Sequence, residues 1–258
     1  MKYIRKYMIA ASLAATAFLP CAHAEGYSDK DKQMIWQNSP TIGLLNGLYD
    51  GLTSVENVRK HGDIGLGTWN RLNGEGLIID GVFYEVHSNG TVHVMPEEAT
   101  LPWVSVTFFA PEMTLDLPVG LTLATLPTQI DPLLPTVNTY YAVRIDGEFD
   151  VVETRSLPTQ KKPYPPFCEV EKTEPKFKFK SVKGTMVGFL SPPFSTNMSV
   201  PNWHLHFLNA DKSGGGHVLA FKLKKGEMKV DRVDDINIEM PTTEAYDKAG
   251  LTSIIQCD

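Results

Sequence analysis

Short runs of alternating apolar and polar residues, separated by turn-forming residues, make up most of the chain from Ile35 onward. Examples are GLIIDGVFYEV, TVHVMP, WVSVTFFAP, YYAVRIDGEFDVVETRS and KFKFKSVKGTMVGFL. A period of two residues is typical of β-strands that bury one face. The pattern therefore predicts a β-rich protein.

Helical periodicity is scarce by comparison. The pattern predicts one helix over residues 53–62, TSVENVRKHG, with Thr53 or Ser54 as its N-cap. A second helical segment is expected to begin near Leu121 and to end before Asp131, which precedes a proline.

A proline-rich stretch interrupts the strand pattern at residues 157–170, LPTQKKPYPPFCEV, which contain four prolines and a lysine pair. Proline cannot donate a backbone hydrogen bond, so we predict a linker or crossing loop there. It would divide an N-terminal α+β domain, residues 25–156, from a C-terminal antiparallel β domain, residues 171–258. The expected fold class is α+β with two β-rich domains: a mixed sheet with few helices, then an antiparallel sheet or half-barrel.

The first 24 residues have the features of an export signal. MKYIRKY is basic, and MIAASLAATAFLP is a short apolar run. AHA, just before Glu25, has the small residues of a signal-peptidase cleavage site. We predict a signal peptide, residues 1–24, cut after Ala24, and a periplasmic or secreted mature protein. A lipoprotein anchor at Cys21 is the competing interpretation, but Pro20 is a poor match to the small residue needed before it. No later stretch reaches the ~18 apolar residues that a membrane-spanning helix needs.

Removal of this leader would make the protein more acidic. The formal net charge of -6 would become about -9, because Lys2, Arg5 and Lys6 are lost. Such a charge disfavours nucleic acid as a partner. An anionic substrate would need a local metal or arginine to hold it.

Two cysteines, Cys168 and Cys257, remain after the leader. In an exported chain they could pair and fix the C-terminal tail, or remain as two thiols. The spacing does not distinguish these alternatives.

Three histidines are concentrated in residues 202–218, NWHLHFLNADKSGGGHV. His204 and His206 are two positions apart, so on a strand both point to one face. NADKSGGG is a strong turn signal. Pairing His206 with His217 across an antiparallel hairpin brings the third ring to the same face and leaves a four-residue loop at 210–213.

Such a trio can bind a metal ion. Neutral imidazole is a common zinc ligand, and three protein ligands with one open position are typical of catalytic zinc sites. Iron, manganese and copper also accept imidazole. The plainer alternative is a solvated strand face, which the third histidine disfavours.

Other candidate residues are less distinctive. In GLGTWNRLNGEGLIIDG, Glu75 begins a strand on the same face as apolar residues, which favours an exposed strand end over a buried acid. Arg155 either points into a cleft or forms a surface ion pair with Glu153 or Asp150. Thr68 alone has no distinguishing feature.

The motifs of serine hydrolases, zinc metalloproteases and thiol oxidoreductases are absent from the sequence. The residues considered so far are also compatible with two other functional classes. They are a cupin-like metal-dependent oxygenase or hydrolase, and a non-catalytic periplasmic metal-binding protein.

Several phrases together resemble the alpha-acetolactate decarboxylase family: HGDIGLGTWNRLNGEG, DGVFYEV, TFFAP, YAVRIDGEFDVVETRS and WHLHFLNADKSGGGHVLAF. The resemblance extends from about Ile35 to Leu251. It departs from the family pattern at Asn73, where aspartate is usual, and at Gly76, where a larger apolar residue is usual.

The resemblance implies a zinc-dependent decarboxylase that converts the small molecule 2-acetolactate to acetoin. Zinc would chelate the hydroxyl and ketone oxygens and stabilise an enediolate. The site would lie in a cleft between the domains, commonly in a homodimer. The residues implied are the zinc ligands His204, His206 and His217 and the active-site residues Arg155, Glu75 and Thr68.

Overall fold

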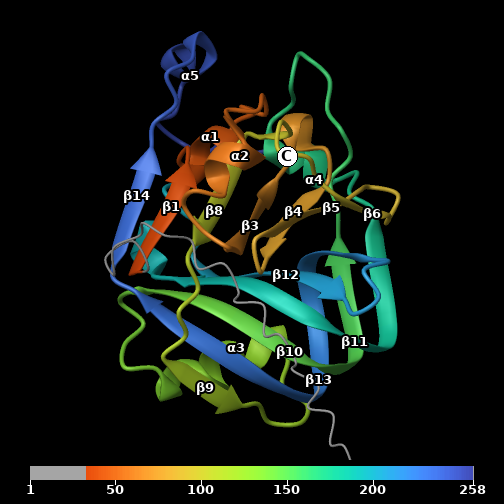
Figure 1. Ribbon diagram of the computed structural model, residues 1–258. Helices are drawn as coiled ribbons and strands as arrows, with labels where there is room; N and C mark the ends of the chain where they lie inside the picture. The colour runs from red at the N-terminus through yellow and green to blue at the C-terminus, as the bar shows by residue number, and fades with distance from the viewer. Residues whose placement is uncertain (1–32, 258) are drawn as a thin grey trace, which may run out of the picture.

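Two β-sheets packed face to face carry most of the chain (Figure 1). The computed structural model describes residues 33–257. The predicted signal peptide, residues 1–24, lies outside the described residues. The predicted α+β class with few helices is confirmed.

The upper sheet in Figure 1 is a seven-stranded mixed sheet, as predicted for the N-terminal part. In spatial order its strands are β14 (Asp235–Glu239), β1 (Met34–Asn38), β8 (Trp103–Thr107), β3 (Ile64–Thr68), β4 (Glu75–Ile79), β5 (Val82–Val86) and β6 (Val92–Val94). β1 and β14 pair in parallel, and the other neighbours are antiparallel.

The lower sheet is antiparallel. Its strands are β10 (Tyr140–Arg155), β11 (Lys176–Ser191), β12 (Asn202–Asn209), β13 (Gly215–Val233) and β9 (Met113–Asp116). β10 also pairs with β13, so the first four strands form a closed ring. The antiparallel arrangement agrees with the prediction, and the closure goes further than the expected half-barrel.

The two sheets take strands from both sides of residues 157–170. β9 and β10 precede this stretch but belong to the lower sheet, whereas β14 follows it and joins the upper sheet. The chain therefore passes between the layers more than once. The division into domains at residues 157–170 stays a prediction about folding units.

The helices are short and lie at the periphery. They are α1 (Thr41–Leu45), α2 (Val55–Val58), α3 (Leu126–Gln129), α4 (Phe167–Glu171) and α5 (Glu244–Lys248); β2 (Thr53–Ser54) and β7 (Thr100–Leu101) form a separate small ladder. None of the helices within residues 33–257 is long and apolar enough to cross a membrane.

Both predicted helical segments are present but shorter than expected. The side chain of Ser54 accepts a hydrogen bond from the backbone nitrogen of Asn57, so it is the N-cap of α2. α2 ends at Val58 and is followed by turns instead of continuing to residue 62. α3 lies between Leu121 and Asp131 as predicted.

Strand alternation decides which layer each side chain of β12 contacts. Leu205 and Phe207 are 1% and 0% exposed and pack inside the ring formed by β10 to β13. Full burial of a side chain of this size contributes about 1.5–3 kcal/mol to folding. The intervening His206 points the other way and contacts Gly76 of β4 in the upper sheet. The apolar pattern of β12 thus directs its histidines into the space between the sheets.

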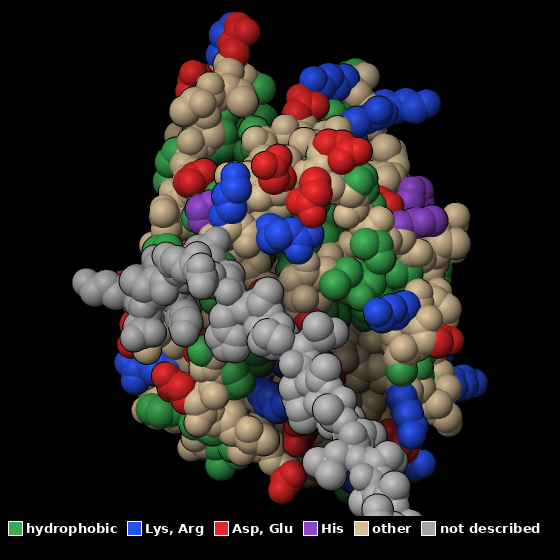
Figure 2. Space-filling view, in the orientation of Figure 1, with side chains coloured by type: hydrophobic (Ala, Val, Ile, Leu, Met, Phe, Trp, Pro, Cys, Tyr) green, Lys and Arg blue, Asp and Glu red, His purple; other side chains and the backbone are tan. Residues whose placement is uncertain are grey.

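Acidic and basic side chains are interspersed on the face of the molecule shown in Figure 2. Many charged side chains of the protein form ion pairs, of which Arg59–Glu97 at 2.8 Å is an example. Such exposed pairs contribute little to stability, about 0–1 kcal/mol each.

Candidate active site

The three predicted histidines converge between the two sheets. β12 and β13 pair with His206 opposite His217, as predicted from the turn signal and the strand alternation. His217 Nδ1 lies 3.2 Å from His204 Nε2 and 3.3 Å from His206 Nε2. Within residues 33–257, this trio is the one group of three or more ligand-forming side chains whose donor atoms lie close enough to share a metal ion.

The spacing of these nitrogen atoms fits a metal ion. Zinc–nitrogen bonds of about 2.0–2.1 Å in a tetrahedron put neighbouring ligand atoms about 3.3 Å apart. His206 donates its Nδ1 proton to the carbonyl oxygen of Gly76, at 2.8 Å. This bond leaves the lone pair of His206 on Nε2, the atom that faces the other two rings.

Burial keeps the three rings neutral, as metal ligands must be. It lowers the pKa of His204 to about 3, and the positive charge of Arg155 lowers it further. Burial is also the main cause of the low pKa of His206 and of His217. At neutral pH each ring therefore has a lone pair to donate.

Gly216 allows the close approach of β13 to β10 beside the trio. Its φ of +123° lies in a region that L side chains rarely adopt. A Cβ atom there would lie 2.3 Å from the carbonyl oxygen of Arg155. The absence of a side chain at position 216 therefore allows the two backbones to lie this close.

Glu75 and Arg155 form a buried ion pair. Arg155 Nη1 donates to Glu75 Oε1 at 2.8 Å, and the two residues are 8% and 3% exposed. The expectation of an exposed strand end for Glu75 is therefore wrong. So is the alternative of a surface pair for Arg155, because Glu153 pairs with Lys178 instead.

The carboxyl group of Glu75 also lies beside the histidines. Its Oε2 is 3.5 Å from Nε2 of His206. Burial raises the pKa of Glu75 to about 7, although Arg155 opposes the shift. A substantial share of the group is consequently protonated at neutral pH.

Thr68 holds the turn that carries Glu75. Thr68 and Glu75 are opposite each other at the ends of β3 and β4, and the Thr68 hydroxyl donates to the carbonyl oxygen of Gly74 at 2.8 Å. Within the same turn, Asn73 donates to the carboxylate of Glu85 and accepts from Thr159. An aspartate at position 73 would repel Glu85, which explains why asparagine fits this chain.

Gly76, the second departure, has little room for a side chain. A Cβ atom there would lie 3.1 Å from the carbonyl oxygen of Gly67 on β3. The missing side chain keeps β3 and β4 close where β4 meets His206.

A cavity of about 270 Å³ brings all six predicted residues together. Residues from α1, β3, β4, β8, β10, α4, β12 and β13 line it, together with two loop residues, Leu157 and Val200. Those from the named elements include Leu44, Thr68, Glu75, Trp103, Arg155, Phe167, His204, His206 and His217. A few polar groups within a mostly apolar wall are typical of small-molecule sites.

Three further residues at this site were not predicted. Glu174 approaches Arg155 Nε at 3.1 Å, and the ring of Phe167 lies 5.5 Å from the guanidinium carbon. Trp103 stacks on His204 with ring centroids 6.0 Å apart. Trp103 and His204 are far apart in the chain, and the contacts of Arg155 with Phe167 and Glu174 depend on how the irregular segment after β10 folds back, so no local pattern marks these residues.

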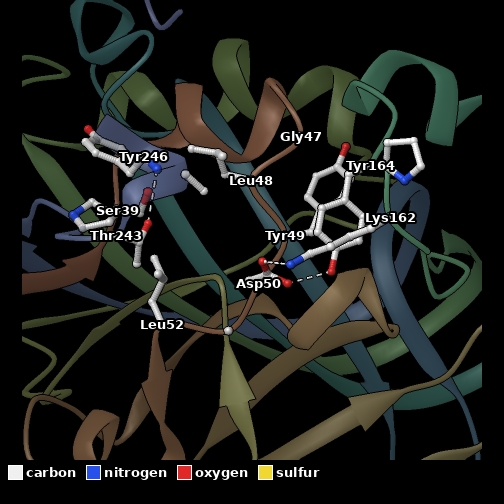
Figure 3. Close-up of a pocket in the computed structure, with 14 residues that line it drawn as sticks. Ser39, Gly47, Leu48, Tyr49, Asp50, Leu52, Lys162, Tyr164, Thr243 and Tyr246 are labelled. Atoms are coloured by element: carbon white, nitrogen blue, oxygen red, sulfur yellow. Dashed lines mark hydrogen bonds and ion pairs between the residues drawn. The ribbon is translucent and has the colours of Figure 1, made fainter. Parts of the chain in front are cut away.

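A larger cavity, of about 350 Å³, lies between the loop after α1, the crossing loop and the segment containing α5 (Figure 3). Lys162 and Tyr164 both point towards Asp50 there, with a 2.6 Å ion pair and a 2.7 Å hydrogen bond (Figure 3). The Tyr49 hydroxyl donates to the carbonyl oxygen of Pro165. Because these polar groups satisfy one another, the smaller cavity is the better candidate for chemistry.

The C-terminal tail is attached beside the candidate site. Cys168 of α4 and Cys257 form a disulfide, with Cα atoms 5.9 Å apart, so of the two alternatives left open the pairing is observed. The backbone of Ser253 and of Ile255 also hydrogen-bonds to the side chain of Asn46, which follows α1. The tail thus connects α1 and α4, two walls of the smaller cavity.

Comparison with known proteins gives a consistent result. The family model described as alpha-acetolactate decarboxylase matches residues 35–253. The chain is 37% identical over 228 residues to the alpha-acetolactate decarboxylase of Bacillus subtilis, covering 88% of this chain and 89% of that protein. It is 36% identical over 231 residues to the one of Methanosarcina mazei, covering 90% and 80%.

The similarity extends to three dimensions. The crystal structure of alpha-acetolactate decarboxylase from Bacillus subtilis strain 168 superposes with a TM-score of 0.83 at 38% identity, over 85% of this chain and 94% of that chain. The sequence resemblance and its limits near residues 35 and 251 are confirmed. The chain belongs to the alpha-acetolactate decarboxylase family, a family of carboxy-lyases.

Proposed function

We propose that the protein converts 2-acetolactate to acetoin with a zinc ion held by His204, His206 and His217. The observation that carries the proposal is the meeting of this trio with Arg155 and Glu75 in one cavity. The donor set fits the metal, because three neutral imidazole nitrogens with tetrahedral spacing leave further coordination positions open. When bound, the metal supplies a Lewis acid for the hydroxyl and ketone oxygens of the substrate.

Arg155 binds the substrate carboxylate in this mechanism. It is the one arginine that lines the cavity, and it supplies the local positive charge that an acidic protein needs for an anionic substrate. The apolar wall formed by Leu157, Phe167 and Val200 limits the water around this carboxylate. Poor solvation favours its loss as neutral carbon dioxide.

Glu75 acts as the acid. When the bond between the carboxylate carbon and its neighbour breaks, the electron pair forms a carbon–carbon double bond and the ketone oxygen becomes negative. Protonated Glu75 then gives its proton to the carbon that lost the carboxylate, and the carbonyl group re-forms as acetoin. Solvent restores the proton. Because Glu75 is fixed by Arg155, the proton arrives on one face and a single enantiomer results.

The test is an acetoin assay on purified protein lacking residues 1–24, with metal analysis of the same sample. We expect acetoin of one enantiomer, with a rate that falls on chelation and returns with zinc. A reaction without protein corrects for spontaneous decarboxylation. Zinc binding without acetoin would indicate a metal-binding protein, and oxygen uptake would indicate an oxygenase; either result contradicts the proposal.

We also propose that the protein is exported, to the periplasm or medium, and acts as a homodimer. The Cys168–Cys257 disulfide supports export, because disulfides persist mainly in oxidising compartments. N-terminal sequencing of the exported protein should begin at Glu25. Light scattering should give twice the mass of the mature chain.

A further inference from the structure

Two carboxylates, not one, surround the guanidinium of Arg155. Glu75 accepts from Nη1 at 2.8 Å, and Oε2 of Glu174 lies 3.1 Å from Nε. The side chains of Arg155, Glu75 and Glu174 are 10%, 4% and 9% exposed. Glu174 does not line the cavity, so any effect on substrate must act through Arg155.

The fold places Glu174 securely. It lies between α4 and β11, where Thr173 donates a backbone hydrogen bond to Val170 at 2.9 Å. On its other side, Ser156 donates to the carbonyl oxygen of Pro175 at 3.1 Å. The β10–β11 ladder adds the pairing of Arg155 with Lys176. Both partners of the ion pair therefore sit on backbone that other contacts already fix.

The contact between Glu174 and Arg155 is poorly explained by stability alone. Oε2 of Glu174 is buried but forms no hydrogen bond with correct geometry to any described residue. A buried carboxylate oxygen without such a bond costs folding energy. A buried polar atom of this kind calls for an explanation, and a functional role is one.

The arrangement around the guanidinium leaves one edge available. Nε faces Glu174, Nη1 faces Glu75, and the ring of Phe167 lies 5.5 Å from the central carbon. Nη2 donates no hydrogen bond to another residue in the described part of the chain. Since Arg155 lines the cavity, Nη2 is the donor left for a ligand.

We propose that Glu174 is a positioning residue: it holds Nε of Arg155 so that the guanidinium touches Glu75 through Nη1 alone and keeps Nη2 for the substrate carboxylate. This inference rests on the proposed function. Without Glu174, the guanidinium can rotate and bind Glu75 through two parallel hydrogen bonds, the geometry that arginine and carboxylate prefer. Arg155 would then be turned away from the substrate.

A purely electrostatic role of Glu174 predicts a change in anion affinity of the opposite sign. If Glu174 only competed with the substrate for Arg155, removing its charge would tighten the binding of anions. The direction of the change therefore distinguishes positioning from competition.

The experiment measures the binding of two ligands to zinc-loaded protein by calorimetry. One is 2,3-dihydroxy-2-methylbutanoate, which is the substrate with its ketone reduced. The other is 2,3-butanediol, which has the same diol without the carboxylate. In Glu174→Gln we expect the dissociation constant of the acid to rise by about 10-fold or more, as for loss of the charge-assisted hydrogen bond between Nη2 of Arg155 and the ligand carboxylate. The dissociation constant of the diol should stay unchanged.

Glu169→Gln is the matched control, because it removes an equal charge from an exposed position of α4 and should affect neither ligand. Should Glu174→Gln fail to fold, Glu174→Asp keeps the charge but withdraws it from Nε. It should weaken binding of the acid in the same direction.

Tighter binding of the acid, no change, or equal weakening of both ligands in the folded variant overturns the role of Glu174. Acetoin formation by the unaltered protein is measured alongside. If it is absent, the proposed function fails and this inference fails with it. If it is present, a negative binding result removes only the role of Glu174.

Discussion

A glutamate that keeps its proton near neutral pH needs both burial and a limited number of positive neighbours, and Glu75 has both. Burial raises its pKa to about 7, the charge of Glu174 adds to the rise, and Arg155 offsets only part of it. A general acid works best when its pKa lies near the working pH. The same residue on an exposed strand end would be ionised and could not donate.

The first prediction concerns Glu75→Gln. The amide keeps the size of the side chain but cannot deliver a proton, so turnover should fall by about 10² to 10⁴. Zinc content should be unchanged, because His206 is oriented by the carbonyl oxygen of Gly76 and not by Glu75. Acetoin formation and metal analysis on the same sample measure both quantities. Glu97→Gln, an exposed ion-pair partner of Arg59, is the control, and near-normal turnover in Glu75→Gln would remove its role as the acid.

At this scale the sequence predicted the histidines far better than the carboxylates. His206 and His217 are joined by one hairpin, so strand alternation and a turn signal were sufficient. Glu75 and Arg155 are 80 residues apart, and Glu174 reaches Arg155 only through the β10–β11 ladder. Whether a charged side chain is buried depends on partners that local pattern does not contain.

Among the elements, the β12–β13 hairpin depends on glycine at position 216. Gly216 and Gly120 both have positive φ, +123° and +85°, but only Gly216 has backbone within contact range. At Gly120 an added Cβ atom would meet nothing within 4 Å. A side chain at Gly120 would therefore cost only backbone conformational energy, whereas one at Gly216 would also clash with the backbone.

The second prediction compares these glycines. Gly120→Ala should lower the free energy of unfolding by about 1 kcal/mol, the cost of a positive φ. Gly216→Ala should cost more, because its Cβ atom would displace the Arg155 carbonyl, and it should also reduce zinc affinity by moving His217. Urea denaturation and zinc titration measure the two effects. Equal stability losses with unchanged zinc affinity would contradict this account of the hairpin.

The third prediction concerns the tail. The Cys168–Cys257 disulfide closes a loop with a sequence separation of 89, so it restricts the unfolded chain strongly. Reduction should lower the free energy of unfolding by about 2–4 kcal/mol. Denaturation curves with and without reductant measure this loss. In Cys257→Ser the reductant should have no further effect, and an equal response in that variant would assign the change to something other than this disulfide.

At the scale of the whole molecule, strands from the two halves of the chain are interleaved in both sheets to a greater extent than the sequence pattern indicates. Alternating runs predicted strands, and the proline-rich stretch at residues 157–170 predicted the crossing, but neither contains information on pairing between strands that are distant in the chain. β10 precedes the crossing and pairs with β11 and β13, which follow it. β14 returns from the end of the chain to pair with β1. Long-range pairing of this kind is set by the fit of complete sheets, which single segments do not specify.

The fourth prediction follows from that interleaving: the two layers should unfold together. Each sheet contains strands from both halves of the chain, and His206 and Arg155 add buried contacts between the sheets. In Trp203→Phe the remaining tryptophans, at positions 36, 69 and 103, belong to the upper layer or the turn beside it. Their fluorescence should therefore change at the same denaturant concentration as far-ultraviolet circular dichroism, which reports both layers. Two separated midpoints would instead show that the two layers unfold independently, and the shared cavity would then depend on their docking.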